Sequence, residues 1–441
     1  MSSQFQYSRA TNLLLGVALC IGAGSNLSTP FMPASTGTSA AVASAAPPRR
    51  AASGSSALKP INQAALQTMV DQTARELLVP GVVVLLRTPQ GEFVATHGTT
   101  ELGTTIRPRT DTHFRIASNT KTMTSAVILQ LAQEGKLSLS DPISKYVPGV
   151  PNGDTITIAE LLEMRSGLYN YTDSPELSAT IDQDHSKVWS TDEVLAIAFA
   201  HPPNFPPGTA YEYNNTNYAL LGVVAEQVTG QPLALLMKER LFGPLGMQHT
   251  LLPPVTVNTM PEPYSHGYQY GTTATVLTGT PHYSQALKAA ARAGTLQPTD
   301  YTDVNYSFVK AAGSVVSTAN DLATWIEALV GGRVLNAAYQ ARWRDSLRPE
   351  DPDKPDGQQY GYGITKLQWS SNAIFFHGGE GPGFNSFMGY DPTNRVTLVA
   401  WTNLPVALDE KTTANTLTLK VLDQIYAVSP LQPSSTPTAA P

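Results

Sequence analysis

The spacing of apolar residues predicts a folded body that begins with a helix and a β-hairpin. Residues 61–78 repeat apolar side chains at helical intervals. Residues 81–87 form a β-branched run, and residues 92–98 follow after Pro89-Gln90-Gly91. Two such runs around a Pro/Gly turn are typical of a hairpin.

Helical patterns dominate the middle of the chain. Residues 118–134 are rich in strong helix formers, and Gly135 follows at a position typical of a helix end. Residues 264–303 show no clear period, and we expect them to form a loop. The other segments with helical patterns in this region are 158–164, 191–200, 218–229 and 233–241.

Strand patterns return near the C-terminal end. A helix is expected at 322–330, then strands at 373–377, 385–390 and 396–401, then a helix at 412–426. Strands from both ends with helices between them predict an α+β fold, in which an antiparallel sheet is flanked by helices. The mostly helical inserted lobe is expected at about residues 136–300, and a cleft between two lobes is a common place for a site.

The two ends of the chain lack such patterns. Residues 1–45 are expected to be a signal peptide, because Arg9 precedes an apolar core and Ala-x-Ala-like sites follow it. An uncleaved membrane anchor and a lipid anchor on Cys20 are the alternatives. Residues 46–57 and 429–441 are expected to be a disordered linker and tail, which leaves 58–428 as the folded domain. The expected location is secreted, periplasmic or in the cell envelope, with no stable membrane span once the signal is removed.

Composition narrows the partners and the chemistry. The net charge is −6 and only 14% of residues are charged, without a Lys/Arg run, so nucleic acid is not an expected partner. Cys20 is the only cysteine, so removal of the signal would exclude disulfides and thiol catalysis. The eight histidines show no ligand spacing such as His-x-x-x-His, and we expect no metal and no other cofactor.

Ser118 and Lys121 are the first candidates for catalysis. Their spacing at the start of a predicted helix places both side chains on one face, one turn apart. A serine hydroxyl is a poor nucleophile until a base takes its proton, and a close neutral amine can do so. The same motif also fits an N-cap serine followed by a solvated lysine.

Tyr213 and Asn215 are the second candidates, and we expect them on a loop. Pro207-Gly208 predicts a turn before them, and a helix is expected to follow. A phenol beside a lysine ammonium can move a proton, and an asparagine can hold a lysine while it donates to a substrate amide. The alternative is a capping loop with a packed tyrosine.

The third candidate is the segment His377-Gly378-Gly379-Glu380, where an apolar strand meets several glycines. Glycines in or beside a strand allow another backbone to approach closely, as a substrate paired along a sheet edge requires. The alternative is a glycine-rich turn with a solvated histidine.

In chain order, these three motifs resemble the serine penicillin-recognising family, which includes class C β-lactamases, D-alanyl-D-alanine carboxypeptidases and related carboxylesterases. Further matching segments span nearly the whole body. They are Phe114-Arg115-Ile116-Ala117, Leu161-Leu162 with Ser166-Gly167-Leu168, residues 211–222 and residues 312–318.

The resemblance implies a role for each candidate position. Ser118 would be acylated, Lys121 would take its proton, and Tyr213 would protonate the leaving group or activate the deacylating water. Asn215 would steady Lys121 and bind the substrate amide. The backbone N–H groups of Ser118 and Glu380 would form the oxyanion hole.

Substrate recognition departs from the family pattern at Gly378. Members that bind a free carboxylate usually carry a hydroxyl residue at this position, whereas His377 stands where many members have lysine and some carboxypeptidase-like members have histidine. Glu380 adds a nearby negative charge. These features weaken the prediction of a substrate with a C-terminal carboxylate.

The resemblance implies an exported serine hydrolase that acts through an acyl-enzyme on Ser118, of the D-alanyl-D-alanine carboxypeptidase type. The alternatives are a carboxylesterase or amidase, a β-lactamase, and a non-catalytic penicillin-binding-like sensor. The expected partner is a small-molecule or peptide substrate, with cell-wall peptides among the candidates.

Overall fold

The structure is a computed structural model that describes residues 58–278, 281–369 and 371–427. The predicted signal peptide, linker and tail lie outside these residues. Within the described residues, no single helix is long and apolar enough to cross a membrane, although the bent pair Asn215–Thr229 and Leu233–Leu245 meets the length and composition limits together.

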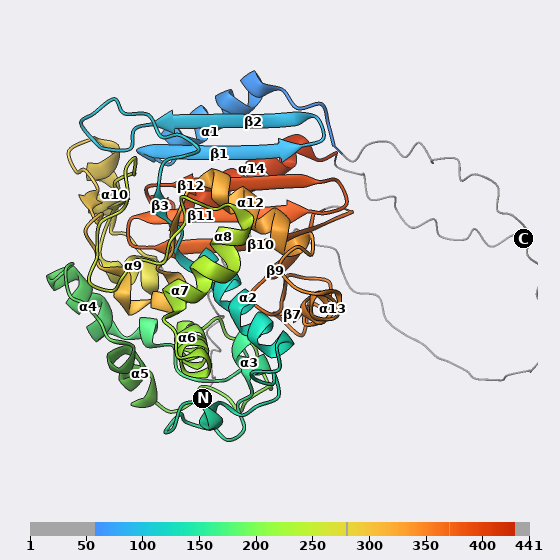
Figure 1. The fold of residues 1–441 in the computed structure, drawn as a ribbon. Helices are drawn as coiled ribbons and strands as arrows, with labels where there is room; N and C mark the ends of the chain where they lie inside the picture. The colour runs from blue at the N-terminus through green and yellow to red at the C-terminus, as the bar shows by residue number, and fades with distance from the viewer. Residues whose placement is uncertain (1–57, 279–280, 370, 428–441) are drawn as a thin grey trace, which may run out of the picture.

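An antiparallel sheet is built from both ends of the chain (Figure 1). Its strand order is β2-β1-β12-β11-β10-β9-β8-β7, so the N-terminal hairpin joins the C-terminal strands through β1 and β12. This arrangement confirms the predicted fold class. The strands are β1 (Gly81–Thr88), β2 (Gly91–Gly98), β7 (Arg348–Pro349), β8 (Gln359–Tyr360), β9 (Thr365–Trp369), β10 (Asn372–Gly381), β11 (Phe384–Asp391) and β12 (Val396–Thr402).

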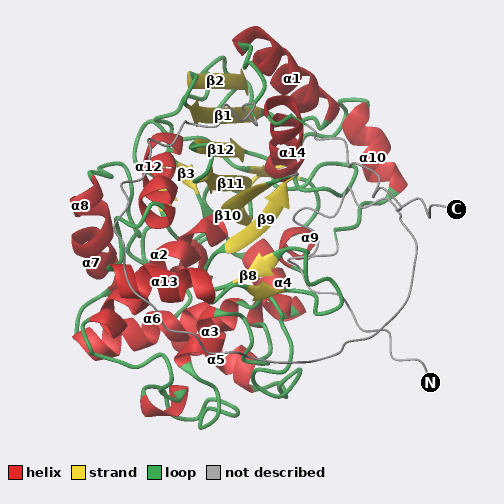
Figure 2. Cartoon of the chain, turned by 90° about the vertical axis from the view of Figure 1, so that its right-hand side faces the viewer, coloured by secondary structure: helices red, strands yellow, loops and turns green. Residues whose placement is uncertain are grey.

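Helices cover both faces of the sheet. Figure 2 shows α12 (Ala319–Val330) on one side of the strands, and α1 (Gln63–Glu76) and α14 (Thr413–Ile425) on the other. Along β1, Val82 and Val84 point into the core under α1 and α14, whereas Val83 and Leu85 point into the core that contains α2 (Thr120–Gln133). Successive side chains of a strand face opposite sides of the sheet, so a strand covered on both faces is apolar throughout.

The remaining helices form a lobe beside the sheet. At its centre, α6 packs against α2, α3, α5 and α11. Much of the apolar core therefore lies between α2 and this lobe. The helices of the lobe and of its borders are α3 (Ile158–Leu162), α4 (Pro175–Gln183), α5 (Thr191–Phe199), α6 (Asn215–Thr229), α7 (Leu233–Met237), α8 (Gly243–Leu245), α11 (Lys310–Gly313) and α13 (Ala337–Asp345).

The prediction of a loop at 264–303 is wrong. This segment contains β4 (Tyr268–Gln269), α9 (Thr273–Leu277), α10 (Gln285–Arg292) and β5 (Thr299–Asp300). Helices this short are marginal by themselves, so their stability comes from tertiary contacts that a local pattern does not record. One such contact is the carboxylate of Asp182 on α4, which accepts hydrogen bonds from the backbone and the hydroxyl of Thr273 at the start of α9.

The strand predicted at 373–377 is longer than expected, because β10 continues through its glycines to Gly381. The glycine-turn alternative for this segment is therefore wrong. β10 also lies so close to the chain before α2 that a side chain at Gly379 would not fit. A Cβ built there would stand 2.1 Å from the carbonyl oxygen of Ile116 and 2.5 Å from Oγ of Ser386.

We predict that Gly379→Ala lowers the free energy of unfolding by about 1–3 kcal/mol, because β10 must move away from the backbone of Ile116. Denaturant unfolding measures this change. Gly243→Ala is the control, since Gly243 has helical backbone angles and its Cβ would meet nothing closer than 3.1 Å. Equal unfolding midpoints for the two variants would contradict the proposed crowding.

Candidate active site

Lys121 is fully buried, and its amine joins three separate segments of the chain. Nζ lies 3.0 Å from Oγ of Ser118, 2.7 Å from Oδ1 of Asn215 and 2.8 Å from the carbonyl oxygen of Ala312. The two latter atoms only accept hydrogen bonds, so each takes one N–H of the amine. In the neutral amine the lone pair then faces Ser118, where it can receive the hydroxyl proton.

Ser118 stands in a tight turn rather than inside the predicted helix. A 3₁₀ turn covers Ala117–Asn119, and α2 begins at Thr120. Ala117 has φ +47°, a left-handed backbone that residues with side chains rarely adopt. The amide of Asn119 holds the turn by donating to the carbonyl of Ile116 and to Oγ of Ser386 on β11. At the far end of α2, Gly135 has φ +71°, as the sequence predicts for a helix end.

Asn215 is the first residue of α6, so its predicted place on a loop is wrong. The helix starts earlier than expected because the side chain of Asn214 caps it, accepting from the backbone N–H of Thr216 at 2.8 Å. The amide orientation of Asn215 is fixed by a hydroxyl. Thr172 donates to Oδ1 of Asn170, so its oxygen accepts from Nδ2 of Asn215 at 2.9 Å, which leaves Oδ1 of Asn215 facing Lys121.

Tyr213 lies outside the helix, as predicted, and is half-buried next to the lysine. Its ring centroid is 4.9 Å from Nζ of Lys121, 6.2 Å from the ring of His377 and 6.3 Å from the ring of Tyr360. The structure thus brings the three sequence motifs together at one place.

His377 is buried and neutral, which excludes a solvated histidine. Its Nδ1 lies 2.6 Å from the carbonyl oxygen of Gly378 and its Nε2 lies 3.2 Å from the hydroxyl of Tyr360. A carbonyl only accepts, so Nδ1 carries the hydrogen and Nε2 accepts from the phenol. Burial lowers the pKa of His377 to about 3, and the charge of Lys121 acts in the same direction.

The end of β10 has an open edge. Pairing with β9 stops at Phe376, whereas pairing with β11 continues to Gly381. Residues 377–381 therefore offer backbone groups to an extended chain. The pleat places Glu380 with Gly378 on the face opposite His377. The charge of Glu380 adds to burial in raising the pKa of Tyr283, so this carboxylate acts on that phenol.

Several residues of the site carry no recognisable sequence signal. Thr172 and Asn170 lie in a short polar and aromatic stretch that matches no motif, and Tyr360 belongs to a strand of two residues. Ala312 contributes only its backbone oxygen. Within the described residues, no cluster of three His, Cys, Asp or Glu side chains could hold a metal ion.

The chain is similar to several known proteins. A family model described as Beta-lactamase matches residues 66–423. A D-stereospecific amidohydrolase from Streptomyces sp. is similar in structure, with a TM-score of 0.69, 29% identity, and coverage of 82% of this chain and 98% of that one. The D-amino acid amidase from Ochrobactrum anthropi SV3 complexed with D-phenylalanine has a TM-score of 0.69, 26% identity, and coverage of 82% and 98%.

Curated relatives match over shorter stretches. Protein flp of Staphylococcus aureus (strain MW2) is 31% identical over 195 residues, which are 43% of this chain and 38% of that protein. The chain thus spans well under two thirds of that relative's length.

The neutral His377 predicts a pH-dependent stability. In the unfolded chain His377 has its ordinary pKa of 6.5. Between pH 6.5 and about 3, His377 is therefore protonated in the unfolded state and neutral in the folded state. The free energy of unfolding should fall as the pH falls through this window, by up to about 1.4 kcal/mol per pH unit. His377→Gln lacks this titration, so the stability advantage of the wild type over this variant should shrink toward low pH.

Urea unfolding between pH 7 and pH 4 measures the effect. His282→Gln is the control, because the side chain of His282 is 85% exposed and its ion pair with Glu410 at 3.6 Å lies at the surface, where such pairs contribute little, so the variant should keep most of the wild-type loss of stability. A constant difference between the wild type and His377→Gln would show that His377 titrates normally.

Proposed function

The chain belongs to the Beta-lactamase family of serine hydrolases, and we propose that it hydrolyses amide bonds through an acyl-enzyme on Ser118. The observation that carries the proposal is the contact of 3.0 Å between Nζ of Lys121 and Oγ of Ser118. A buried amine that acceptors on other segments hold in place is positioned to take the proton of a nucleophile within hydrogen-bond distance.

In the proposed first step, Oγ of Ser118 bonds to the substrate carbonyl carbon while its proton passes to Lys121. The carbonyl oxygen becomes an oxyanion, which the backbone N–H groups of Ser118 and Glu380 would stabilise. Removal of one such donor typically costs about 2.7–4 kcal/mol of transition-state stabilisation. Collapse then breaks the C–N bond, and the leaving nitrogen takes a proton.

Tyr213 is the proposed donor of that proton, since its ring lies beside Lys121. In the second step a water molecule gives a proton to the same phenol–lysine pair and attacks the ester carbonyl of the acyl-enzyme. The acid product leaves, and Oγ of Ser118 regains its proton. Asn215 would keep the amine in place through both steps.

The proposed substrates carry no carboxylate beside the scissile bond. A neutral His377 supplies no cation, and Gly378 supplies no hydroxyl, so β10 lacks the two side-chain features that would hold such a group. The similar structures are named as a D-stereospecific amidohydrolase and a D-amino acid amidase. We therefore infer small amides of amino acids, with the D configuration taken from those relatives.

A D-alanyl-D-alanine carboxypeptidase is the second candidate. It is favoured by the Ser118-x-x-Lys121 and Tyr213-x-Asn215 motifs, which that group of enzymes shares. An esterase would use the same acyl-enzyme step. A β-lactamase would need to bind the carboxylate of its substrate, for which β10 supplies neither a cation nor a hydroxyl.

We predict that the wild type releases ammonia from D-phenylalaninamide faster than it releases D-alanine from a D-alanyl-D-alanine peptide. A p-nitrophenyl ester and a chromogenic cephalosporin complete the panel. Ser118→Ala is the control and should lose all acyl transfer. Turnover that survives in this variant would contradict the mechanism, and faster D-alanine release would favour the carboxypeptidase.

The same panel of substrates, applied to Gly378→Thr, tests whether the missing hydroxyl at position 378 disfavours substrates with a carboxylate. A hydrogen bond to a charged group is worth about 1.5–3 kcal/mol, so the new hydroxyl should raise relative kcat/KM for the carboxylate-bearing peptide about tenfold or more. An unchanged preference would count against the role given to Gly378.

For the acid–base step, we predict that Tyr213→Phe lowers kcat by about 10²- to 10⁴-fold, the range of general acid–base catalysis. Steady-state kinetics on the best substrate measure it. Tyr362→Phe is the control, because the charges that act on its phenol are those of Glu163, Arg348 and Arg342, none of which belongs to the proposed site, so its loss should leave kcat unchanged. Wild-type turnover in Tyr213→Phe would remove this residue from the mechanism.

A further inference from the structure

Arg115, three residues before the nucleophile, is buried with most of its hydrogen-bond donors unpaired. Its side chain is 1% exposed. Nη2 donates to the carbonyl oxygen of Thr302 at 3.2 Å and to that of Asn258. Nε has no partner, and the described residues offer no acceptor to Nη1. Three of the five guanidinium hydrogens therefore lack a protein acceptor.

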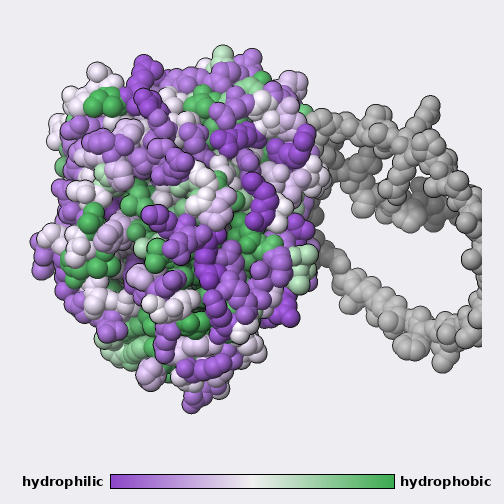
Figure 3. Space-filling view, in the orientation of Figure 1, coloured by the Kyte–Doolittle hydropathy of each residue, from purple (hydrophilic) through white to green (hydrophobic). Residues whose placement is uncertain are grey.

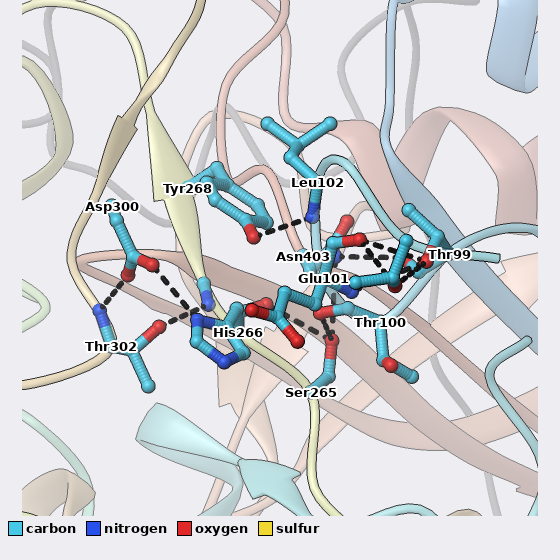
Figure 4. A network of polar contacts seen from close by, with 12 residues as sticks. Thr99, Thr100, Glu101, Leu102, Ser265, His266, Tyr268, Asp300, Thr302 and Asn403 are labelled. Atoms are coloured by element: carbon cyan, nitrogen blue, oxygen red, sulfur yellow. Dashed lines mark hydrogen bonds and ion pairs between the residues drawn. The ribbon is translucent and has the colours of Figure 1, made fainter. Parts of the chain in front are cut away.

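No carboxylate in the described part of the chain forms an ion pair with this guanidinium. Asp300, which is close to Thr302 in sequence, is used elsewhere. Figure 4 shows its carboxylate bonded to Nδ1 of His266 at 2.8 Å and to the backbone N–H of Thr302 at 2.8 Å. The face of Tyr306, 4.6 Å from Cζ of Arg115, gives only a weak cation–π contact. Burial lowers the pKa of Arg115, and the charge of Asp303, which forms no ion pair with it, opposes that shift only in part. A buried cation whose charge is only partly balanced is costly.

A small cavity adjoins the guanidinium. Its volume is about 10 Å³, room for a single water-sized particle. Ser307 accepts a hydrogen bond from the backbone of Trp189, so its own hydroxyl hydrogen is available for an occupant of the cavity. Lys310 adds a second positive charge, which Glu226 balances at 2.9 Å. Besides Arg115 the lining includes Val255, Val257, Ser307, Lys310 and Ser314.

We propose that this cavity binds one monatomic anion of the halide class against the guanidinium of Arg115. Room for one water-sized particle favours a monatomic anion over sulfate or phosphate, and the valines make part of the wall apolar. A weakly hydrated guanidinium suits a weakly hydrated anion such as chloride or bromide. The anion balances the buried charge and accepts from the donors that the protein leaves unpaired.

The site also touches the elements that carry the catalytic groups. Arg115 ends the short strand β3 (Phe114–Arg115), which leads into the turn of Ser118. Tyr306, which covers the guanidinium, donates its hydroxyl to the carbonyl of Pro382 at the tip of the β10–β11 hairpin at 2.5 Å. A bound anion would therefore stiffen both the nucleophile turn and the end of β10.

The surface hydropathy does not indicate a second binding site. On the face shown in Figure 3, the apolar residues form small separate patches.

Thermal unfolding at constant ionic strength measures the binding, with sodium gluconate replaced stepwise by sodium bromide. We expect the Tm of the wild type to rise saturably by a few degrees, because a ligand that binds only the folded state stabilises it. Arg109→Met is the control, since this exposed guanidinium is paired with Asp111, and it should keep the shift. Arg115→Met should lose it.

If Arg115→Met fails to fold, Ser307→Ala replaces it in the experiment. The bromide concentration that gives half of the Tm shift should be several-fold higher for Ser307→Ala than for the wild type. Anomalous scattering from crystals grown in bromide should show one peak beside the guanidinium. A halide-independent Tm, a shift that persists in the folded Arg115→Met, or density that contains only water at this site would overturn the proposal.

Discussion

The burial of the Lys121 amine is the constraint on which the rest of the structure depends. A lysine without exposure to solvent is tolerable only where acceptors surround it, and these come from three places in the chain: Ser118 before α2, Asn215 on α6 and Ala312 on α11. Packing of α2 against α6 and α11 therefore also assembles the proposed catalytic group. A change that separates these helices would lose stability and chemistry together.

The second constraint is the close approach of β10 to the nucleophile turn. Gly379 permits it, because its missing side chain leaves room for the carbonyl of Ile116. The histidine two positions earlier enters the same crowded space without a charge, since burial and Lys121 both oppose its protonation. One positive group at most thus faces the substrate from these elements. Under the proposed function, that balance favours an amide substrate over one with a carboxylate.

Sequence patterns were sufficient for what depends on local chain geometry. The apolar runs predicted β1, β2, β10, β11 and β12, although they missed β7, β8 and β9 at the far edge of the sheet. The spacing of Ser118 and Lys121 placed them on adjacent turns. Site residues whose role depends on contacts between distant segments of the chain were not predicted. Ala312 works through its backbone oxygen, which any residue type carries, and Thr172 matters only because α6 begins at Asn215. The elements within 264–303 are too short for a period to emerge, and their contacts to Asp182 are non-local.

Two buried basic residues, Arg115 and Lys121, lie on either side of Ala117 in the sequence. They differ in how many of their hydrogen-bond donors the protein pairs. Lys121 meets fixed acceptors on neighbouring helices, so its position is set by hydrogen bonds. Arg115 gives only two of its five hydrogens to protein oxygens and rests against an aromatic face. The left-handed backbone of Ala117 lies between them. Strain of this kind persists only where the surroundings hold it on both sides. The hydrogen bonds of Lys121 hold one side, so an occupant that completes the hydrogen bonding of Arg115 would supply the restraint on the other.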